Sequence, residues 1–532
     1  MISKIKKWIR KNKGEFYLLL LILAVGAILR LYKIGGYMTF LGDEGRDAII
    51  VRRLLVNFDP VLIGPGTSIG NMYLGPLYYY LSAPFLLFAN FSPVGPSVMV
   101  ALFGVATIYL IWYIARLWFG KGAGMVSSLL YALAPVVIIY NRSSWNPNIM
   151  PFFALLTIFS LWKVWGEEKF SWFVVMGVSF AFVLQSHYLG LLLLPVILFF
   201  WSLKHWGLFR NSDLEISNYP GNYLKKSYIK NLLIGTIVFA VLMSPLLIFD
   251  LRHNFMNFNN IKTFFTQRET TVSVKPWKSL PNIYPIFRDS VVHRLVAAQN
   301  ILAGKISINI IVFAVVTYMV LMLTKLKRIL FTSDEKLYFD KGALLLIVWI
   351  GSGLIGLGLY KQHVYDHYFG FIYPAIFLLI GAIYQKIMNS HFDGLKIIIT
   401  AWIVVLIGSY VVYSPLRGQP NFQMARAADV AKVIREDAGS SKFNLAVVAV
   451  QNYEDGYQYF LEKDGANVTD IDALRLEETM GEYLYVVCEL PEENCDPVNS
   501  PKAEVANFGW SKVVGKWGRG GVTIFKLAHV TP

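Results

Sequence analysis

Residues 16–31 read FYLLLLILAVGAILRL, an apolar run long enough to form most of a membrane-spanning helix. Hydrophobic residues make up 55% of the 532-residue chain, and the mean hydropathy is +0.50. Other runs of this kind recur, and they are continuous rather than alternating, which indicates helices and not barrel strands. The first run follows a lysine-rich start, and no small-residue cleavage site comes after it. We therefore interpret it as an uncleaved first span and not as a signal peptide.

Eleven such runs are expected to cross the membrane, which places the two ends of the chain on opposite sides. They are 16–33, 95–116, 122–140, 148–164, 170–186, 188–203, 231–249, 302–324, 342–360, 368–385 and 395–413. The basic N-terminus and the basic loops at 204–230 and 325–341 then lie on the cytoplasmic side, as the positive-inside rule requires. The sequence thus predicts an α-helical, multi-pass protein of the cell (inner or plasma) membrane. Residues 1–413 are its transmembrane domain and 414–532 an extracytoplasmic domain.

Two external segments are more than simple loops. Between the first two spans, 45–57 and 77–91 have the pattern of helices that lie in the membrane interface. The loop at 250–300 is external yet rich in lysine and arginine. Two interpretations of its charge stay open: a solvated basic loop, or a surface that attracts phosphate head groups. The net charge of +15 suits either.

The tail from 414 onward changes composition and predicts a small α/β domain. Residues 425–437 have the pattern of an amphipathic helix, and 443–450, 483–490 and 522–526 have the pattern of strands. Both cysteines of the chain, Cys488 and Cys495, lie in this part. In an oxidising compartment they can form a disulfide, and two free thiols are the alternative.

A charged stretch after the first span suggests a site for proton transfer beside a bound anion. It reads Asp43-Glu44-Gly45-Arg46. Adjacent acids point in different directions on any regular element, so Asp43 and Glu44 do not suit the two-carboxylate arrangement of glycosidases. We expect one to act as a base and the other as its partner. The alternative is that both acids only cap the helix that follows.

Further segments follow in order along the chain. They are Gly75-Pro76-Leu77-Tyr78-Tyr79-Tyr80, Tyr140-Asn141-Arg142-Ser143, the stretch 245–253, and His367-Tyr368-Phe369. With the acid pair, they make the membrane part resemble the GT-C superfamily of membrane glycosyltransferases. These enzymes take a sugar from a polyprenyl-phosphate carrier, as protein O-mannosyltransferases and lipid A aminoarabinose transferases do. The resemblance implies an outward-facing site and an inverting transfer of a hexose or pentose to a hydroxyl of a lipid, glycan or protein.

The resemblance also implies roles for charged residues. Asp43 matches the catalytic base, with Glu44 in support, and Arg46 matches a contact to the carrier phosphate. Lipid A transferases have a lysine before the Pro-Leu of the second segment, where this chain has Leu74 and Gly75. Other cations must therefore help to bind the phosphate, and the candidates are Arg252, Lys275, Arg294 and Lys361.

Aromatic and imidazole side chains near the outer ends of the spans are the expected lining of the substrate cavity. They are Tyr78, Tyr79, His187, Tyr188, His363, His367 and Tyr368. For His187 and Tyr188, a packed pair at the membrane interface is the alternative. His363 and His367 would share a face if helical, and with Asp366 they leave a metal site open as an alternative to an interfacial aromatic belt. The sequence requires no cofactor, and a divalent metal stays an open question.

The expected partners are a polyprenyl-phosphate-linked sugar, an acceptor molecule and membrane lipids, and no nucleic-acid motif is found. An alternative function is transport or flipping of lipid-linked sugars. Transporters carry charges at mid-membrane and often have repeated halves. In this chain most acids lie at the outer ends of the spans and no repeat is visible, which favours the enzyme.

Overall fold

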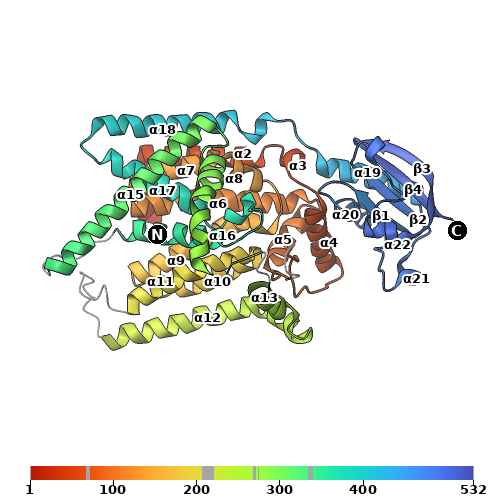
Figure 1. Ribbon diagram of the computed structural model, residues 1–532, viewed down its shortest axis with the longest axis horizontal. Helices are drawn as coiled ribbons and strands as arrows, with labels where there is room; N and C mark the ends of the chain where they lie inside the picture. The colour runs from red at the N-terminus through yellow and green to blue at the C-terminus, as the bar shows by residue number, and fades with distance from the viewer. Residues whose placement is uncertain are drawn as a thin grey trace.

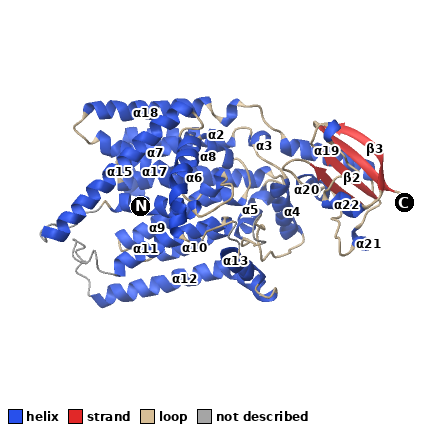
Figure 2. Ribbon diagram, viewed as in Figure 1, coloured by secondary structure: helices blue, strands red, loops and turns tan. Residues whose placement is uncertain are grey.

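The computed structural model describes residues 2–67, 72–205, 221–267, 271–273, 275–332 and 340–530. A bundle of helices forms most of the molecule, and a small sheet lies at the far end, next to the C-terminus (Figures 1 and 2). Arg210 and Lys336, in the two predicted cytoplasmic loops, lie outside the described residues.

Within those ranges, seven helices are long and apolar enough to cross a membrane. They are α2 (Lys13–Leu31), α6 (Val94–Trp118), α9 (Met150–Gly166) with the preceding turn η1 (Asn146–Ile149), α12 (Gly221–Arg252), α15 (Ile301–Thr332), α16 (Lys341–Gly358) and α18 (Asp393–Val412). Each coincides with a predicted span. A short basic helix, α1 (Ile2–Lys11), precedes α2.

The four other predicted spans are helical but shorter or interrupted. Three are the short apolar helices α10 (Trp172–Ser186), η2 (Tyr188–Leu193) continued by α11 (Leu194–His205), and α17 (Tyr373–Met388). The fourth is divided into α7 (Lys121–Leu133) and α8 (Pro135–Tyr140). It breaks at Pro135, which has no N–H for a helix interior. The count of eleven spans stays a prediction.

The segment between α2 and α6 contains α3 (Ile34–Tyr37), α4 (Gly42–Val56) and α5 (Leu77–Phe88). The two helices predicted here are confirmed, but α4 begins three residues before the predicted start. Asp43 and Glu44 therefore belong to its first turn and do not precede it.

The basic segment 250–300 is not simply a solvated loop. It contains α13 (Met256–Thr266), η3 (Pro276–Ser279), α14 (Leu280–Ile286) and the π-helical η4 (Phe287–Val296). In η4, Val292, Leu295 and Val296 are buried in the main hydrophobic core of the bundle. The solvated-loop interpretation is therefore wrong for η4, because its apolar residues pack inside the bundle.

The C-terminal part is an α/β domain with strand order β1-β2-β4-β3. β1 (Phe443–Val448) and β2 (Tyr483–Cys488) are parallel, and β4 (Val522–His529) is antiparallel to both β2 and β3 (Ser511–Arg519). Its helices are α19 (Gln423–Ala438), α20 (Asp455–Lys463), α21 (Leu476–Thr479) and α22 (Ala503–Phe508). The predicted helix and three predicted strands are confirmed, and β3 was not predicted.

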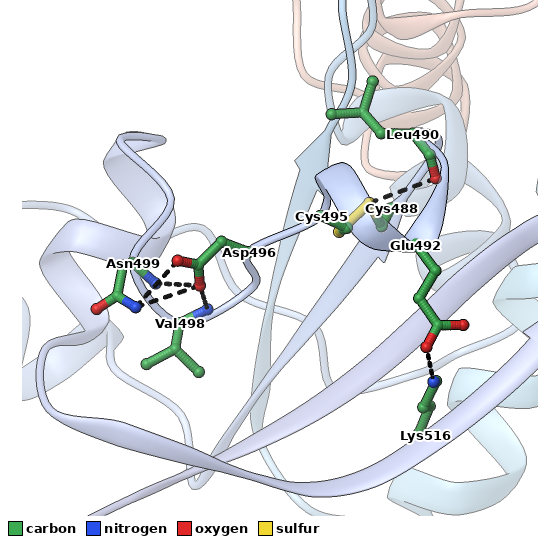
Figure 3. The surroundings of a disulfide bond; sticks show 8 residues. All are labelled: Cys488, Leu490, Glu492, Cys495, Asp496, Val498, Asn499 and Lys516. Carbon is green, nitrogen blue, oxygen red and sulfur yellow. Dashed lines mark hydrogen bonds and ion pairs between the residues drawn. A yellow bond between two sulfur atoms is a disulfide. The ribbon is translucent and has the colours of Figure 1, made fainter.

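Cys488 and Cys495 are bonded to each other (Figure 3). The bond ties the end of β2 to the turn η7 (Glu492–Asn494) and the residue that follows it. Glu492 also forms an ion pair with Lys516 of β3 (Figure 3). The disulfide expected from the sequence is therefore present.

A shared hydrophobic core joins the C-terminal domain to the segment after α2. Its buried members include Met38, Phe40 and Ile49 from the segment between α2 and α6, with Val430 of α19 and Tyr459 of α20. In Figure 1, α20 lies between α4 and the sheet. The domain therefore packs directly on the helix that carries the acid pair.

Candidate functional site

The first turn of α4 presents its two acids to different surroundings. Glu44 is 6% exposed, and its Oε2 accepts a hydrogen bond of 3.0 Å from the backbone N–H of Leu41. An acid that caps the first turn in this way also lies at the positive end of the helix dipole. The side chain of Asp43 is 40% exposed. The capping interpretation is thus right for Glu44, while Asp43 remains accessible.

Arg46 connects two carboxylates on one face of α4. Its Nη1 donates to Asp43 Oδ1 at 2.9 Å, and its Nη2 donates to Asp47 Oδ1, also at 2.9 Å. Asp47 is 4% exposed and accepts a further bond of 3.1 Å from the Tyr79 hydroxyl. Sequence reasoning missed Asp47. Its spacing of four from Asp43 would have placed both on one helical face, had the helix been predicted to begin at residue 42.

The C-terminal domain reaches the same turn. The Tyr453 hydroxyl donates to Asp43 Oδ1, and Arg46 Nη1 lies 3.4 Å from the same hydroxyl. Asn452 Oδ1 accepts a bond of 2.9 Å from the backbone N–H of Gly42. The sequence contains no local signal for these contacts, because Tyr453 lies 410 positions after Asp43.

A cavity of about 220 Å³ opens beside Asp43. Its lining comes from three regions: the start of α4, the segment from α8 to η1, and the loop before α20. The lining residues are Thr39, Leu41, Gly42, Asp43, Glu44, Ile139, Tyr140, Ser143, Trp145, Asn148, Gln451 and Tyr453. This volume is smaller than the usual range for a small-molecule pocket, roughly 300–1,000 Å³.

Burial changes the protonation of the acids around the cavity. The pKa of Glu44 is raised to about 7, mainly by burial and in part by the charges of Asp43 and Asp47, although the backbone hydrogen bond from Leu41 opposes the shift. Burial likewise raises the pKa of Asp47 to about 6, although Arg46 opposes the shift. Burial also raises the pKa of Tyr453, and Asp43 adds to this, so its phenol stays a hydrogen-bond donor at neutral pH. Glu44 is therefore partly protonated near neutrality.

The predicted imidazoles form a second cluster near the cavity. The His187 ring lies 5.9 Å from that of His367 and 5.1 Å from that of Tyr368, between ring centroids. The His367 ring lies 4.5 Å from that of Trp145, a cavity residue. Burial lowers the pKa of His187 to about 4 and that of His367 to about 3, so both rings are neutral at pH 7.

His363 and His367 do not share a helical face. His363 lies in a non-helical segment, and His367 in the short 3₁₀ turn η5 (Asp366–Phe369). The His363 ring contacts that of Tyr365 at 4.6 Å. Among the residues that the structure describes, no group of three or more histidine, cysteine or acidic side chains could hold a metal ion.

Tyr78, Tyr79 and Tyr188 are not among the residues that line this cavity. Tyr78 and Tyr79 are buried in α5. The Tyr188 hydroxyl donates to the backbone oxygen of Tyr73 and accepts from Asn257 of α13 at 3.0 Å, which ties it to α13.

Of the four phosphate-binding cations predicted in addition to Arg46, Arg294 has the clearest connection to the cavity. It pairs with Asp366 at 3.1 Å, and both interact electrostatically with the cavity residue Tyr140. Arg252 and Lys275 are exposed. The backbone N–H of Lys361 bonds to Thr271. No described contact brings Arg252 or Lys275 to the cavity lining.

Comparison with known proteins gives a partial sequence match. Residues 74–214 match the family model described as dolichyl-phosphate-mannose-protein mannosyltransferase. YkcB of Bacillus subtilis (strain 168), a protein proposed to be a mannosyltransferase, is 30% identical over 105 residues. That match covers 19% of this chain and 14% of YkcB. It therefore concerns a small part of either protein.

Solved structures match over nearly the whole chain. ArnT from Cupriavidus metallidurans, bound to undecaprenyl phosphate, has a TM-score of 0.58 at 13% identity, covering 95% of this chain and 97% of ArnT. The oligosaccharyltransferase AglB from Archaeoglobus fulgidus, bound to an inhibitory peptide and a dolichol-phosphate, has a TM-score of 0.51 at 12% identity. That match covers 90% of this chain and 70% of AglB. The fold implied by the sequence resemblance is confirmed: this chain shares the fold of ArnT and AglB.

Proposed function

We propose that this protein transfers a sugar from a polyprenyl-phosphate carrier to a hydroxyl group, with Asp43 as the general base. The observation that carries the proposal is the first turn of α4, where an accessible carboxylate lines a cavity beside an arginine. The match of residues 74–214 to phosphate-linked mannose transferases supports the donor class. The ligands in the ArnT and AglB structures, both polyprenyl phosphates, support it as well.

In the proposed reaction, the acceptor oxygen attacks the anomeric carbon of the carrier-linked sugar. The bond between that carbon and the phosphate oxygen breaks, and the polyprenyl phosphate leaves with the bonding electrons. The acceptor proton passes to Asp43, which must lie within hydrogen-bond reach of the hydroxyl. Attack from the side opposite the phosphate inverts the anomeric centre.

Asp43 suits the role of base better than Glu44. Asp43 is accessible from the cavity, whereas Glu44 is buried and already accepts a bond from the helix backbone. We assign Glu44 to the support of the turn. This division agrees with the sequence argument that two adjacent acids on a helix cannot face the same bond.

The carrier phosphate requires positive charge at the site. Arg46 is partly exposed and suits a bidentate phosphate contact, but in this structure it already balances Asp43 and Asp47. We therefore propose Arg294 as the second cation, because it lies near Tyr140 at the cavity and can exchange Asp366 for phosphate. Arg252, Lys275 and Lys361 remain candidates for binding the carrier phosphate.

The proposed orientation follows the charge pattern. We propose that the N-terminus is cytoplasmic and that the cavity and the C-terminal domain face the outside, through eleven spans. The acceptor is then a lipid, glycan or protein of the cell envelope.

The experiment that tests this proposal compares Asp43→Asn with wild type in membranes from cells lacking the gene, using undecaprenyl-phosphate mannose as donor. Loss of the base should lower turnover about 10²- to 10⁴-fold. Binding of undecaprenyl phosphate should remain. Asp59→Asn, an exposed acid beyond the end of α4, is the matched control and should behave as wild type.

Mass spectrometry of lipid-linked sugars and surface glycans, with and without the active protein, identifies the sugar and the acceptor. Near-normal turnover by Asp43→Asn would remove Asp43 as the base. Unchanged glycans together with altered sidedness of the carrier lipid would favour flipping over transfer.

A further inference from the structure

The hydroxyl of Tyr453 crosses from the C-terminal domain to bond the carboxylate assigned as the base. Both of its neighbours at this point, Asp43 and Arg46, belong to α4. Asp43 and Tyr453 line the same cavity, and Arg46 lies next to it. The site is thus built from two parts of the chain that are distant in sequence.

The two hydrogen bonds to Asp43 end on the same oxygen of its carboxylate. Asp43 Oδ1 accepts from both Arg46 and Tyr453, whereas no described residue donates to Oδ2. A carboxylate held by two donors on one oxygen keeps a single orientation, which leaves the other oxygen for an incoming hydroxyl. Such preorganisation matters because a misplacement of about 1 Å can cost on the order of 10²-fold in rate.

Tyr453 itself is held firmly against the start of α4. The aromatic ring lies over Gly42, where an added Cβ would lie 2.4 Å from ring carbons. Asn452 Oδ1 accepts from the backbone N–H groups of both Gly42 and Tyr453, each at 2.9 Å. The Asn452 amide in turn donates to Glu489 at 2.6 Å. These contacts fix the ring relative to the helix, so the hydroxyl position is determined by the fold.

We propose that Tyr453 is a positioning residue, by which the C-terminal domain orients Asp43 for proton transfer. This inference rests on the proposed function, in which Asp43 is the base. The C-terminal domain then contributes to the chemical step.

The test is Tyr453→Phe, which keeps the ring over Gly42 and removes only the hydroxyl. The assay uses undecaprenyl-phosphate mannose and membranes from cells lacking the gene. The expected result is a fall in kcat of about 10-fold, with KM for the donor within about twofold of wild type, because the group lost acts on the base and not on the carrier. The thermal midpoint should not change.

Tyr459→Phe is the matched control. The Tyr459 hydroxyl also crosses from the C-terminal domain, donating at 2.6 Å to the backbone oxygen of Phe91, but it does not contact Asp43. If the two variants lose the same kcat, the hydroxyl of Tyr453 serves only to dock the domain, and the proposal is wrong. It is also wrong if Tyr453→Phe turns over at the wild-type rate.

The activities of the two variants distinguish a failure of this inference from a failure of the proposed function. A dead Asp43→Asn variant with a fully active Tyr453→Phe variant removes only the positioning role. An active Asp43→Asn variant removes both. The same variants are also compared by the surface glycan that they restore in cells lacking the gene, which requires no knowledge of the sugar.

Discussion

The contact between α4 and α20 has two ends that differ in kind. At the inner end, an added Cβ on Gly45 would lie 2.3 Å from the backbone of Asp455 and Gly456, so the two segments touch without intervening side chains. At the outer end, Arg53 and Glu462 form an ion pair of 2.7 Å, with the arginine side chain 46% exposed. The same pair of helices is thus joined by close backbone packing at the cavity and by a solvated charge pair away from it.

The two ends of this contact should differ in how much they contribute to docking of the C-terminal domain. Close packing tolerates no added atom, because protein interiors are as dense as organic crystals. An exposed ion pair contributes little, since solvent and salt screen it and two long side chains must be ordered. We therefore expect the docking of the C-terminal domain to depend on the inner end, next to Asp43 and Tyr453.

The largest effect is expected from Gly45→Ala. In an isolated helix this change stabilises by about 1 kcal/mol, so any loss has to come from the contact with α20. Overpacking against rigid backbone should cost about 3 kcal/mol of unfolding free energy and lower activity as well. Thermal unfolding in detergent and protease cleavage between α18 and α19 measure the loss.

Gly394→Ala is the control for this change. Gly394 also lies in the first turn of a helix, α18, and an added Cβ there meets no atom within 4 Å. It should be neutral or slightly stabilising. Equal behaviour of the two variants would contradict the close contact at Gly45.

A medium effect is expected from Glu44→Gln, and it depends on pH. Burial raises the pKa of Glu44 in the folded protein to about 7 from its ordinary 4.5. The folded state therefore holds the proton more tightly than the unfolded state, and the wild type loses stability as pH rises through this interval. Glutamine has no such loss, so the variant should gain up to about 2 kcal/mol relative to wild type between pH 5 and pH 8.

Thermal midpoints of the two proteins across this pH range measure the gain. The exposed Glu436 of α19 provides the control Glu436→Gln, which should follow the wild-type curve. Parallel curves for Glu44→Gln and wild type would show that Glu44 is not buried as described.

The smallest effect is expected from Arg53→Ala. An exposed ion pair of this kind is worth about 0.2–1 kcal/mol, and less at high salt. A double-mutant cycle with Glu462→Ala, run at low and high salt, isolates the pair. A coupling well above this range that persisted at high salt would show that the outer end is more than a screened contact.

The sequence predicted the bulk of the fold because membrane helices leave a strong local signal. Long apolar runs such as 95–116 and 395–413 correspond to α6 and α18, since a helix in hydrocarbon must satisfy its backbone internally. In the tail, β1 and β2 were found because most of their residues are apolar and buried. β3 was missed because it is an exposed edge strand in which Lys512, Lys516 and Arg519 interrupt the pattern.

The site was predicted only where its residues are close in sequence. Asp43, Glu44 and Arg46 were identified together, and helix periodicity explains why the two acids differ. Asp47 was missed because α4 was predicted to begin three residues too late, at 45 and not at Gly42. His363 and His367 do not share a helical face because that segment is irregular. The His367 ring packs against Trp145 and His187, and the His363 ring packs against Tyr365.

The sequence by itself determined that this protein is a bundle of membrane helices with an acid pair after its first span. Each of these features follows from the order of residues within a single segment of the chain. Only the tertiary structure decided that Tyr453 contacts Asp43 and that Gly45 lies against α20. These contacts join segments about 410 positions apart, and they form because a shared apolar core holds the C-terminal domain on α4. No local pattern records such a pairing, since it depends on how two surfaces fit and not on the residues of either one alone.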